Sequence, residues 1–306
     1  MNNLSSAYKE AFFNLLRNKK KEDSEYTLPQ GYNRDTDTYI YPTGYEKDFN
    51  KAIKRENLFR RFGTVIDAPS FDGNIQTVVS DGIAQIVDSS EAYPESNDTF
   101  SNISYSSYKI ASLSKLKNTF ISDMKFDIEK YLTSDFARRF GRAEESLAIN
   151  GTGVDEPTGI LTSGQVGITT SNDTITADDV INLYFKLKPE YRNNAVWIMN
   201  DNTAMALRTL KDQNGNYLWR STDDTIFSNP VVISNYMPDV NEGSMPIAFG
   251  DLSYYWTLIR KPLNVKTLTE QFAINDITGF AANERLDSKL IRPEAIKILK
   301  VGTAEE

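Results

Sequence analysis

The sequence contains neither cysteine nor histidine, and these two absences exclude whole classes of chemistry. Without histidine there is no imidazole general base, no Ser-His-Asp relay and no histidine-ligated zinc. Without cysteine there is no thiolate nucleophile, disulfide or Fe–S ligand, which fits a reducing compartment. What remains is carboxylate, lysine or tyrosine chemistry, or no chemistry at all.

Long apolar runs are also missing, and the balance of charge is acidic. The apolar runs span only a few residues, and the basic cluster near the N-terminus follows its apolar residues, so neither a membrane span nor a signal peptide is expected. A formal net charge of −8 opposes general attraction to a nucleic-acid backbone, although a container for DNA can be acidic. With 306 residues, 40% of them hydrophobic, the protein can fill one large core or two ordinary ones.

One segment has no positive charge at all. From Phe62 to Tyr108 there is no lysine or arginine. Residues 64–121, which include most of this segment, contain β-branched or alternating runs such as "NIQTVVS" and "NISYSSYKIASL", so they predict strands and a long hairpin. A hairpin with one sign of charge either extends into solvent or lies on a basic surface elsewhere. Its carboxylates are Asp67, Asp72, Asp81, Asp88, Glu91, Glu95 and Asp98.

Helical periodicity appears on both sides of this hairpin. Residues 4–16 carry an apolar stripe, which we interpret as an arm docked on its own protein or a neighbour, with a membrane-surface helix as the alternative. A second helix is predicted over 45–62. The strongest signal is the apolar series over 124–147, a helix that ends at Asn150. This long helix carries three arginines midway: Arg138, Arg139 and Arg142.

Beyond Gly164 the sequence alternates between helix and strand. "TADD", from Thr176 to Asp179, is a capping box that opens a helix, "NAVWIMN" is a buried strand, and "DNTAMALRTLKD" is a helix closed by the turn "QNGN". Four strands are expected next, in "PVVISNYMP", "MPIAFGD", "YYWTLIR" and "LNVKTLTEQ". Two β-like runs around Pro293 end the chain.

The glycine-rich stretch "AINGTGVDEPTGIL" is predicted to turn a corner and not to bind phosphate. Gly151 and Gly153 begin a G-x-G pattern, but Glu156 takes the place of the third glycine and the stretch follows a helix, not a strand. No Gly-Lys-Ser/Thr sequence is present. We expect positive φ at Gly151 and Gly153, while Pro157 stiffens the turn. Gly159 then leads into the second half of the chain, and no cofactor is expected.

No residue set identifies an enzyme or a metal site. Asp35, Asp37 and Glu46 nearly match a calcium loop, but a tyrosine and an isoleucine stand where a ligand and a turn glycine are needed. Glu144 and Glu145 are adjacent and point different ways around a helix, so we interpret them as a solvated face. Serine and lysine are plentiful, but no spacing identifies a Ser-Lys dyad. We therefore expect no catalytic residue, metal or small-molecule substrate.

The order of these pieces resembles the major capsid proteins of tailed bacteriophages, of the Hong Kong 97 type. The resemblance covers nearly the whole chain: an N-terminal arm, an acidic hairpin, one long helix, a corner and an α/β region. Its most specific parts are "INGTGVDEPTGIL", the segment from Trp197 to Trp219, "PVVISNYMP" and "IAFGD".

This resemblance implies an α+β subunit of a virion shell. Hundreds of copies would form hexamers and pentamers of an icosahedral capsid around double-stranded DNA, assembled in the host cytoplasm with a scaffolding protein and a portal as partners. The implied parts are an N-terminal arm (1–44), a peripheral domain in three pieces (45–66, 109–165 with the long spine helix, and 277–306), an extended hairpin loop (67–108) and an axial domain (166–276).

The charge pattern adds a hypothesis about assembly. In such shells the extended loop lies over a neighbouring subunit, so we expect its carboxylates to meet a basic surface there. Individual exposed pairs contribute about 0–1 kcal/mol, but their repetition around a ring can steer assembly. The carboxylates in question include Asp81, Asp88, Glu91 and Glu95, and the basic candidates are the three spine arginines, or Arg60 and Arg61.

Two features depart from the family, and three alternatives stay open. Some members link their subunits covalently through a lysine on the extended loop, but no lysine occurs between Lys54 and Lys109, so no such cross-link is expected. Many members begin with a scaffolding segment that a protease removes, whereas this chain begins close to the arm, which fits a separate scaffolding protein or a processed form.

The nearest alternative is an encapsulin, a cellular shell of the same fold. A hydrolase and a virion adhesin are more distant.

Overall fold

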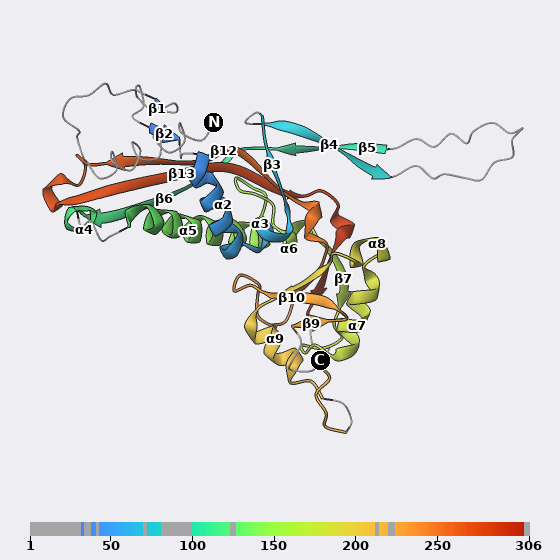
Figure 1. The fold of residues 1–306 in the computed structure, drawn as a ribbon. Helices are drawn as coiled ribbons and strands as arrows, with labels where there is room; N and C mark the ends of the chain where they lie inside the picture. The colour runs from blue at the N-terminus through green and yellow to red at the C-terminus, as the bar shows by residue number, and fades with distance from the viewer. Residues whose placement is uncertain are drawn as a thin grey trace, which may run out of the picture.

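The computed structural model describes residues 32–33, 38–40, 43–69, 72–80, 99–122, 127–211, 214–219 and 224–302. These residues form two units, each built on its own six-stranded sheet, and the units together have the shape of an L (Figure 1). A two-stranded ribbon projects from the first unit. Within the described residues, no helix is both long and apolar enough to cross a lipid bilayer.

The first unit is a long sheet with helices on one face (Figure 1). Its sheet has the order β1-β2-β12-β13-β6, and β3 pairs with β12. The strands are β1 (Tyr32–Asn33), β2 (Thr38–Ile40), β3 (Thr64–Asp67), β6 (Tyr108–Lys117), β12 (Tyr255–Leu268) and β13 (Ile277–Leu290). The helices are α2 (Thr43–Glu56), α3 (Leu58–Phe62), α4 (Asn118–Ser122) and α5 (Ile128–Asn150), with 3-10 turns η1 (Leu252–Tyr254) and η2 (Ala273–Asn275).

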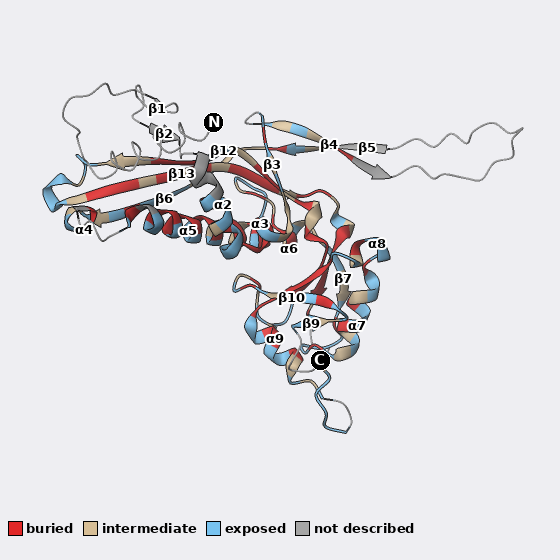
Figure 2. Ribbon diagram, in the orientation of Figure 1, coloured by how far each residue is buried: buried red, intermediate tan, exposed pale blue. Residues whose placement is uncertain are grey.

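The apolar stripe predicted for the spine helix builds the core of this unit. Leu132, Phe136 and Phe140 of α5 are buried against α2 and the sheet, where Phe280 of β13 is also buried. The buried stripe of α5 appears along its sheet-facing side in Figure 2. A buried side chain of this size stabilises the fold by about 1.5–3 kcal/mol.

Capping residues decide where these helices begin and end. The helix predicted over 45–62 is two helices, because the side chain of Asn57 accepts hydrogen bonds from the N–H groups of Phe59 and Arg60 and so starts α3. The side chain of Asp127 caps the start of the spine helix by accepting a hydrogen bond from the N–H of Lys130. The helix ends at Gly151, as expected.

A proline interrupts β12, an inner strand of the long sheet. We predicted two strands in "YYWTLIR" and "LNVKTLTEQ", but they form the single strand β12. Its pairing with β13 shifts register between Ile259 and Lys261, and again between Lys261 and Asn264, the interval that contains Pro262. On the side of β12 that faces away from β13, β3 pairs with residues 256–259 and β2 pairs with residues 264–265. Pro262 therefore lies where neither outer strand needs an N–H donor, which is why a proline is tolerated inside this strand.

The second unit is a mixed sheet with short helices around it (Figure 1). Its sheet has the order β7-β14-β11-β8-β10-β9. The strands are β7 (Gln165–Thr169), β8 (Val196–Met199), β9 (Thr225–Ile226), β10 (Asn229–Ile233), β11 (Ile247–Gly250) and β14 (Ile296–Lys300). The helices are α6 (Ile160–Ser163), α7 (Ala177–Lys186), α8 (Pro189–Arg192) and α9 (Asp201–Arg208), with a 3-10 turn η3 (Pro293–Ala295).

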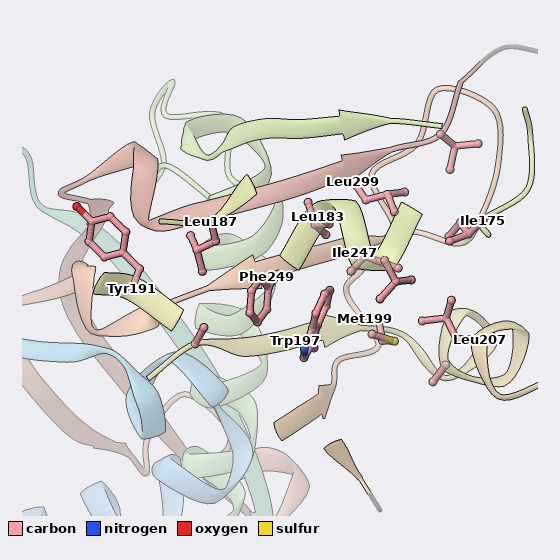
Figure 3. Packing of buried hydrophobic residues seen from close by; sticks show 14 of the residues in the cluster. Ile175, Leu183, Leu187, Tyr191, Trp197, Met199, Leu207, Ile247, Phe249 and Leu299 are labelled. Atoms are coloured by element: carbon pink, nitrogen blue, oxygen red, sulfur yellow. The ribbon is translucent and has the colours of Figure 1, made fainter. Parts of the chain in front are cut away.

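Sequence signals in this unit are confirmed. Thr176 and Asp179 form the predicted capping box at the start of α7, and every residue of β8 is buried. Figure 3 shows the core, in which the rings of Trp197 and Phe249 stack with centroids 4.0 Å apart. The indole N–H of Trp197 donates to the carbonyl of Ile226, so this buried side chain has a polar partner.

The two sheets do not follow the domain ranges expected from the sequence. β12 lies inside the range 166–276 assigned to an axial domain, yet it pairs with β13, β2 and β3 in the first unit. β14 lies inside 277–306, which was assigned to the peripheral domain, yet it pairs with β7 and β11 in the second unit. The polypeptide therefore crosses between the units more often than the sequence ranges imply.

The predicted hairpin begins as an antiparallel ribbon of β4 (Gly73–Ser80) and β5 (Thr99–Tyr105). The ribbon projects beyond both sheets in Figure 1. The loop carboxylates Asp81, Asp88, Glu91 and Glu95 lie outside the described residues, as do residues 4–16 and the calcium-like Asp35 and Asp37.

Candidate functional site

A buried cluster of charges joins three elements of the first unit. Arg60 of α3 donates to Glu144 of α5 through Nε (2.8 Å) and Nη2 (2.9 Å), and Nη2 also donates to Glu284 of β13 at 2.8 Å. The three side chains are only 3%, 5% and 2% exposed. Asn57, which caps α3, also donates to Glu144 at 3.0 Å. One guanidinium therefore connects α3 to the spine helix and to the sheet.

The neighbouring carboxylate extends this cluster to the second unit. Glu145 accepts a hydrogen bond from the N–H of Leu58 at 3.1 Å and another from the hydroxyl of Ser234, just after β10, at 2.6 Å. The side-chain amide of Asn150, at the end of α5, donates to the carbonyl of Tyr236 nearby. We call Arg60, Glu144, Glu145, Ser234 and Glu284 the buried joint, because they tie the spine helix to both units.

Two sequence interpretations are wrong at this joint. Glu144 and Glu145 were expected to form a solvated face, but both are buried. Arg60 of α3 pairs with Glu144, while Leu58 and Ser234 donate hydrogen bonds to Glu145. Arg60 was a candidate for a basic surface that meets a neighbour, but it is buried and paired with two carboxylates. Arg61, the other candidate beside it, is exposed.

The joint holds three carboxylates and one arginine, and the pKa values of two of these carboxylates, Glu284 and Glu145, are raised. Burial raises the pKa of Glu284, and although Arg60 lowers it, the nearby Glu144 raises it again, to about 7. Burial also raises the pKa of Glu145, although its bonds from Ser234 and Leu58 oppose the rise. The Oε2 atom of Glu284 is buried without a hydrogen-bond partner among the described residues. Glu284 therefore favours a retained proton as the pH approaches neutrality.

A basic cleft lies beside the joint, between α2, α3, β3 and β12. Its volume is about 700 Å³. Arg60 and Glu284 reach it from the joint, and apolar residues of α2 and β12 complete its walls. The charged residues that line it are Lys54, Arg60, Arg61, Asp67, Arg260 and Glu284. Within the described residues, no group of acidic side chains could hold a metal ion.

The three spine arginines differ in how much positive charge they offer. Arg138 and Arg139 both pair at 3.0 Å with Asp135, whose side chain is only 3% exposed. Arg139 also donates to the carbonyl of Leu113 on β6. Arg142 is exposed and forms no ion pair with any described residue. The arginines gather on one helix, as predicted, but one carboxylate already neutralises part of their charge.

The glycine corner is closed by its own hydrogen bonds. The N–H of Gly159 donates to the carbonyl of Gly151 at 2.9 Å, and the carboxylate of Glu156 accepts from the N–H of Thr152 at 2.9 Å. Those bonds to Thr152 lower the pKa of Glu156. Since a carboxylate of the protein itself already occupies this amide, the corner is not built to receive a phosphate.

The glycines of the corner serve two different needs. Gly153 has a φ of +79°, as expected, but Gly151 has a φ of −55°, so the prediction of positive φ there was wrong. Gly151 is needed for space: a Cβ on it would stand 2.1 Å from the carbonyl oxygen of Pro157. Gly159 is equally confined, with the carbonyl oxygen of Ile149 at 2.4 Å from its Cβ position.

Comparison with known proteins assigns the family. A sequence model described as the phage capsid family matches residues 37–301, which is most of the chain and includes both units. The chain belongs to the phage capsid family. This capsid protein has no match among curated proteins.

Solved structures agree with the family. The capsid of a native GTA particle, computed with C5 symmetry, is 28% identical to this capsid protein and superimposes with a TM-score of 0.67, covering 82% of this chain and 90% of that chain. Structures from Microbacterium phage Oxtober96 (16% identity, TM-score 0.61, 80% and 91% covered) and Gordonia phage Cozz (11%, 0.61, 82% and 87%) share the fold. The capsid protein therefore has the Hong Kong 97 fold, and the comparisons favour a phage capsid over an encapsulin.

Sequence reasoning missed the buried joint of this capsid protein. Arg60 is separated from Glu144 by 84 positions and from Glu284 by 224, so no local pattern places them together. One signal was available. Glu144 follows Phe140 by four residues, so it lies on the apolar stripe of the spine helix, where a charge is buried unless the stripe ends.

Proposed function

We propose that this capsid subunit self-associates into hexamers and pentamers of an icosahedral shell that encloses double-stranded DNA. The observation that carries the proposal is the family match over residues 37–301, which includes both sheets and the projecting ribbon. Assembly takes place in the host cytoplasm, with a scaffolding protein and a portal as partners. The subunit acts by shape and surface, not by catalysis.

The buried joint gives the subunit the stiffness that such a role needs. A shell subunit transmits force from one neighbour to the next, so its two units must hold one relative orientation. The junction between them is an apolar cluster that includes Phe59, Ile149, Tyr255 and Ile298, all buried. The joint lies next to it and adds directional bonds, which specify one arrangement more sharply than apolar contact alone.

The acidic loop and a basic surface of the neighbour supply register. Loop residues Asp81, Asp88, Glu91 and Glu95 carry charge of a single sign, so they favour a cationic partner. With Arg60 buried and Asp135 shared by two arginines, the exposed Arg142 and Arg61 become the stronger candidates for that partner. Each pair is weak alone, and its repetition around a ring provides the steering.

Negative-stain microscopy of the purified full-length protein tests the function directly. We expect rings or closed shells, and we expect particles from infected cells to protect double-stranded DNA from nuclease. A protein that stays a compact monomer with and without its scaffolding protein would contradict the shell role. Closed particles that hold enzymes and no DNA would support the encapsulin alternative.

Charge reversal at Arg142 tests the register hypothesis. Arg142→Glu places a negative charge on the exposed face of α5 without disturbing Asp135, so the variant should fold but lose capsomers in size-exclusion chromatography at low salt. The matched control is Lys130→Glu, an exposed residue of the same helix, which should assemble normally. Equal assembly of both variants at low salt would remove Arg142 from the interface.

A further inference from the structure

The sequence contains two Asn-Gly pairs, Asn150–Gly151 and Asn214–Gly215, and the fold treats them differently. In such a pair the backbone nitrogen of glycine can attack the carbonyl carbon of the asparagine amide. A new C–N bond closes a five-membered succinimide ring. The bond from the same carbon to the side-chain nitrogen breaks, and that NH2 group takes the proton of the backbone N–H and leaves as ammonia. Water then opens the ring to aspartate or isoaspartate, with no oxidation or reduction. Glycine favours the attack because it has no Cβ to obstruct it.

The fold blocks this reaction at Asn150. The N–H of Gly151 donates to the carbonyl of Leu147 at 2.8 Å, as the last bond of the spine helix. The side-chain amide of Asn150 donates to the carbonyl of Tyr236 at 2.9 Å. Ring closure needs both bonds to break, and Gly151 is buried, with the carbonyl oxygen of Pro157 only 2.1 Å from its Cβ position.

The same pair is exposed at Asn214. The segment is a turn at the foot of the second unit (Figure 1), closed where Lys211 bridges Tyr217 and the N–H of Leu218 donates to the carbonyl of Leu210 at 3.0 Å. Asn214 and Gly215 both face solvent. Gly215 has a φ of +85°, and nothing lies within 4 Å of its Cβ position. No neighbouring atom therefore crowds this glycine, in contrast to Gly151.

We propose that Asn214 is a site of spontaneous deamidation in the folded protein, whereas the fold protects Asn150. Each conversion replaces a neutral amide with a carboxylate, so it moves the formal net charge of the chain from −8 to −9. The new charge arises in the turn that Lys211 and Tyr217 close, where the ammonium of Lys211 lies 4.9 Å from the ring centroid of Tyr217. If the protein forms a shell, as proposed above, subunits of different age then carry different charge at this turn. This consequence rests on the proposed function.

Peptide mass spectrometry of the full-length protein tests the proposal. The native protein is incubated at mildly alkaline pH, in parallel with the same protein in concentrated urea, and both are digested. In the native sample we expect the peptide with Asn214 to gain the mass of an amide replaced by a carboxyl group, largely as isoaspartate, while the peptide with Asn150 stays unchanged. In urea both sites should convert at comparable rates, because the fold no longer distinguishes them.

Two variants separate the chemistry from indirect effects. Asn214→Gln should remove the acidic form seen on isoelectric focusing, because a glutamine would have to close a less favourable six-membered ring. Asn214→Asp should reproduce that acidic band at once, without isoaspartate. The proposal is overturned if Asn214 keeps its amide in the native protein while it is lost in urea, or if Asn150 converts as fast as Asn214 in the native protein. Neither result depends on whether shells form.

Discussion

Glu284 should make the stability of the unassembled protein fall as pH rises toward 7. Its pKa is raised from 4.5 to about 7 in the folded protein, chiefly by burial. Between these two values the folded state binds more protons than the unfolded state, so the free energy of unfolding decreases as pH rises. The stabilising contribution is fully present below pH 4.5 and is lost as pH passes through 7. Glu284→Gln cannot ionise and should remove this dependence.

The size of the effect follows from the separation of the two pKa values. Each pKa unit corresponds to about 1.4 kcal/mol, so ionisation of Glu284 in the folded state costs about 3 kcal/mol of stability. A glutamine at this position keeps an oxygen for the bond from Arg60 Nη2 and loses the buried charge. We therefore compare the unfolding free energies of Glu284→Gln and the parent at each pH. Between pH 4.5 and a pH above 7, the variant should gain about 3 kcal/mol of stability relative to the parent.

Urea unfolding followed by tryptophan fluorescence measures this difference across the pH range. The matched control is Glu242→Gln, which changes an exposed carboxylate in the same way and should give a nearly constant difference from the parent. Arg60→Met provides the opposite perturbation. It leaves two buried carboxylates without a cation, so it should cost about 3–5 kcal/mol at neutral pH and less in acid, where both carboxylates take up protons.

A constant difference in unfolding free energy between Glu284→Gln and the parent at every pH would contradict the raised pKa of Glu284. That result would mean that Glu284 keeps its charge in the folded state at all pH values above its ordinary pKa. It would also mean that Arg60 alone balances both carboxylates, and that the buried Oε2 atom finds a donor in solution.

Two further predictions concern the corner and the assembled particle. Gly151→Ala should destabilise the fold by about 1–3 kcal/mol in thermal or urea unfolding, because its Cβ would meet the carbonyl of Pro157. The control Gly243→Ala should cost less, because its Cβ meets nothing within 4 Å and only the positive φ opposes it. Equal costs would show that the backbone of the corner shifts to accommodate the added Cβ. Denaturing electrophoresis of mature particles should give a single band near 34.6 kDa, because no lysine lies between Lys54 and Lys109, and a ladder of linked subunits would contradict this.

The sequence alone was enough for the local elements. The spacing of Phe136 and Phe140 predicts a helix whose stripe is buried, and Gly151 marks its end because glycine is common just past a helix. The capping box at Thr176 and the apolar strand over 196–199 were equally readable. Each of these depends on neighbours within a few positions, so the pattern carries all the information that the element needs.

Only the tertiary structure decided how those elements combine and which charges are buried. β12 and β14 are plain strands by sequence, and their sheets depend on partners far along the polypeptide. The sequence suggested that Glu144 faces solvent, because the residue that compensates its buried charge, Arg60 of α3, is 84 positions away and no local pattern connects the two. The same dipeptide has different surroundings at its two positions, because Asn150–Gly151 is hydrogen-bonded at the end of the spine helix and Asn214–Gly215 lies in an exposed turn. Local sequence determines which bonds a residue can form, whereas long-range packing determines which of them it forms, and whether water can compete.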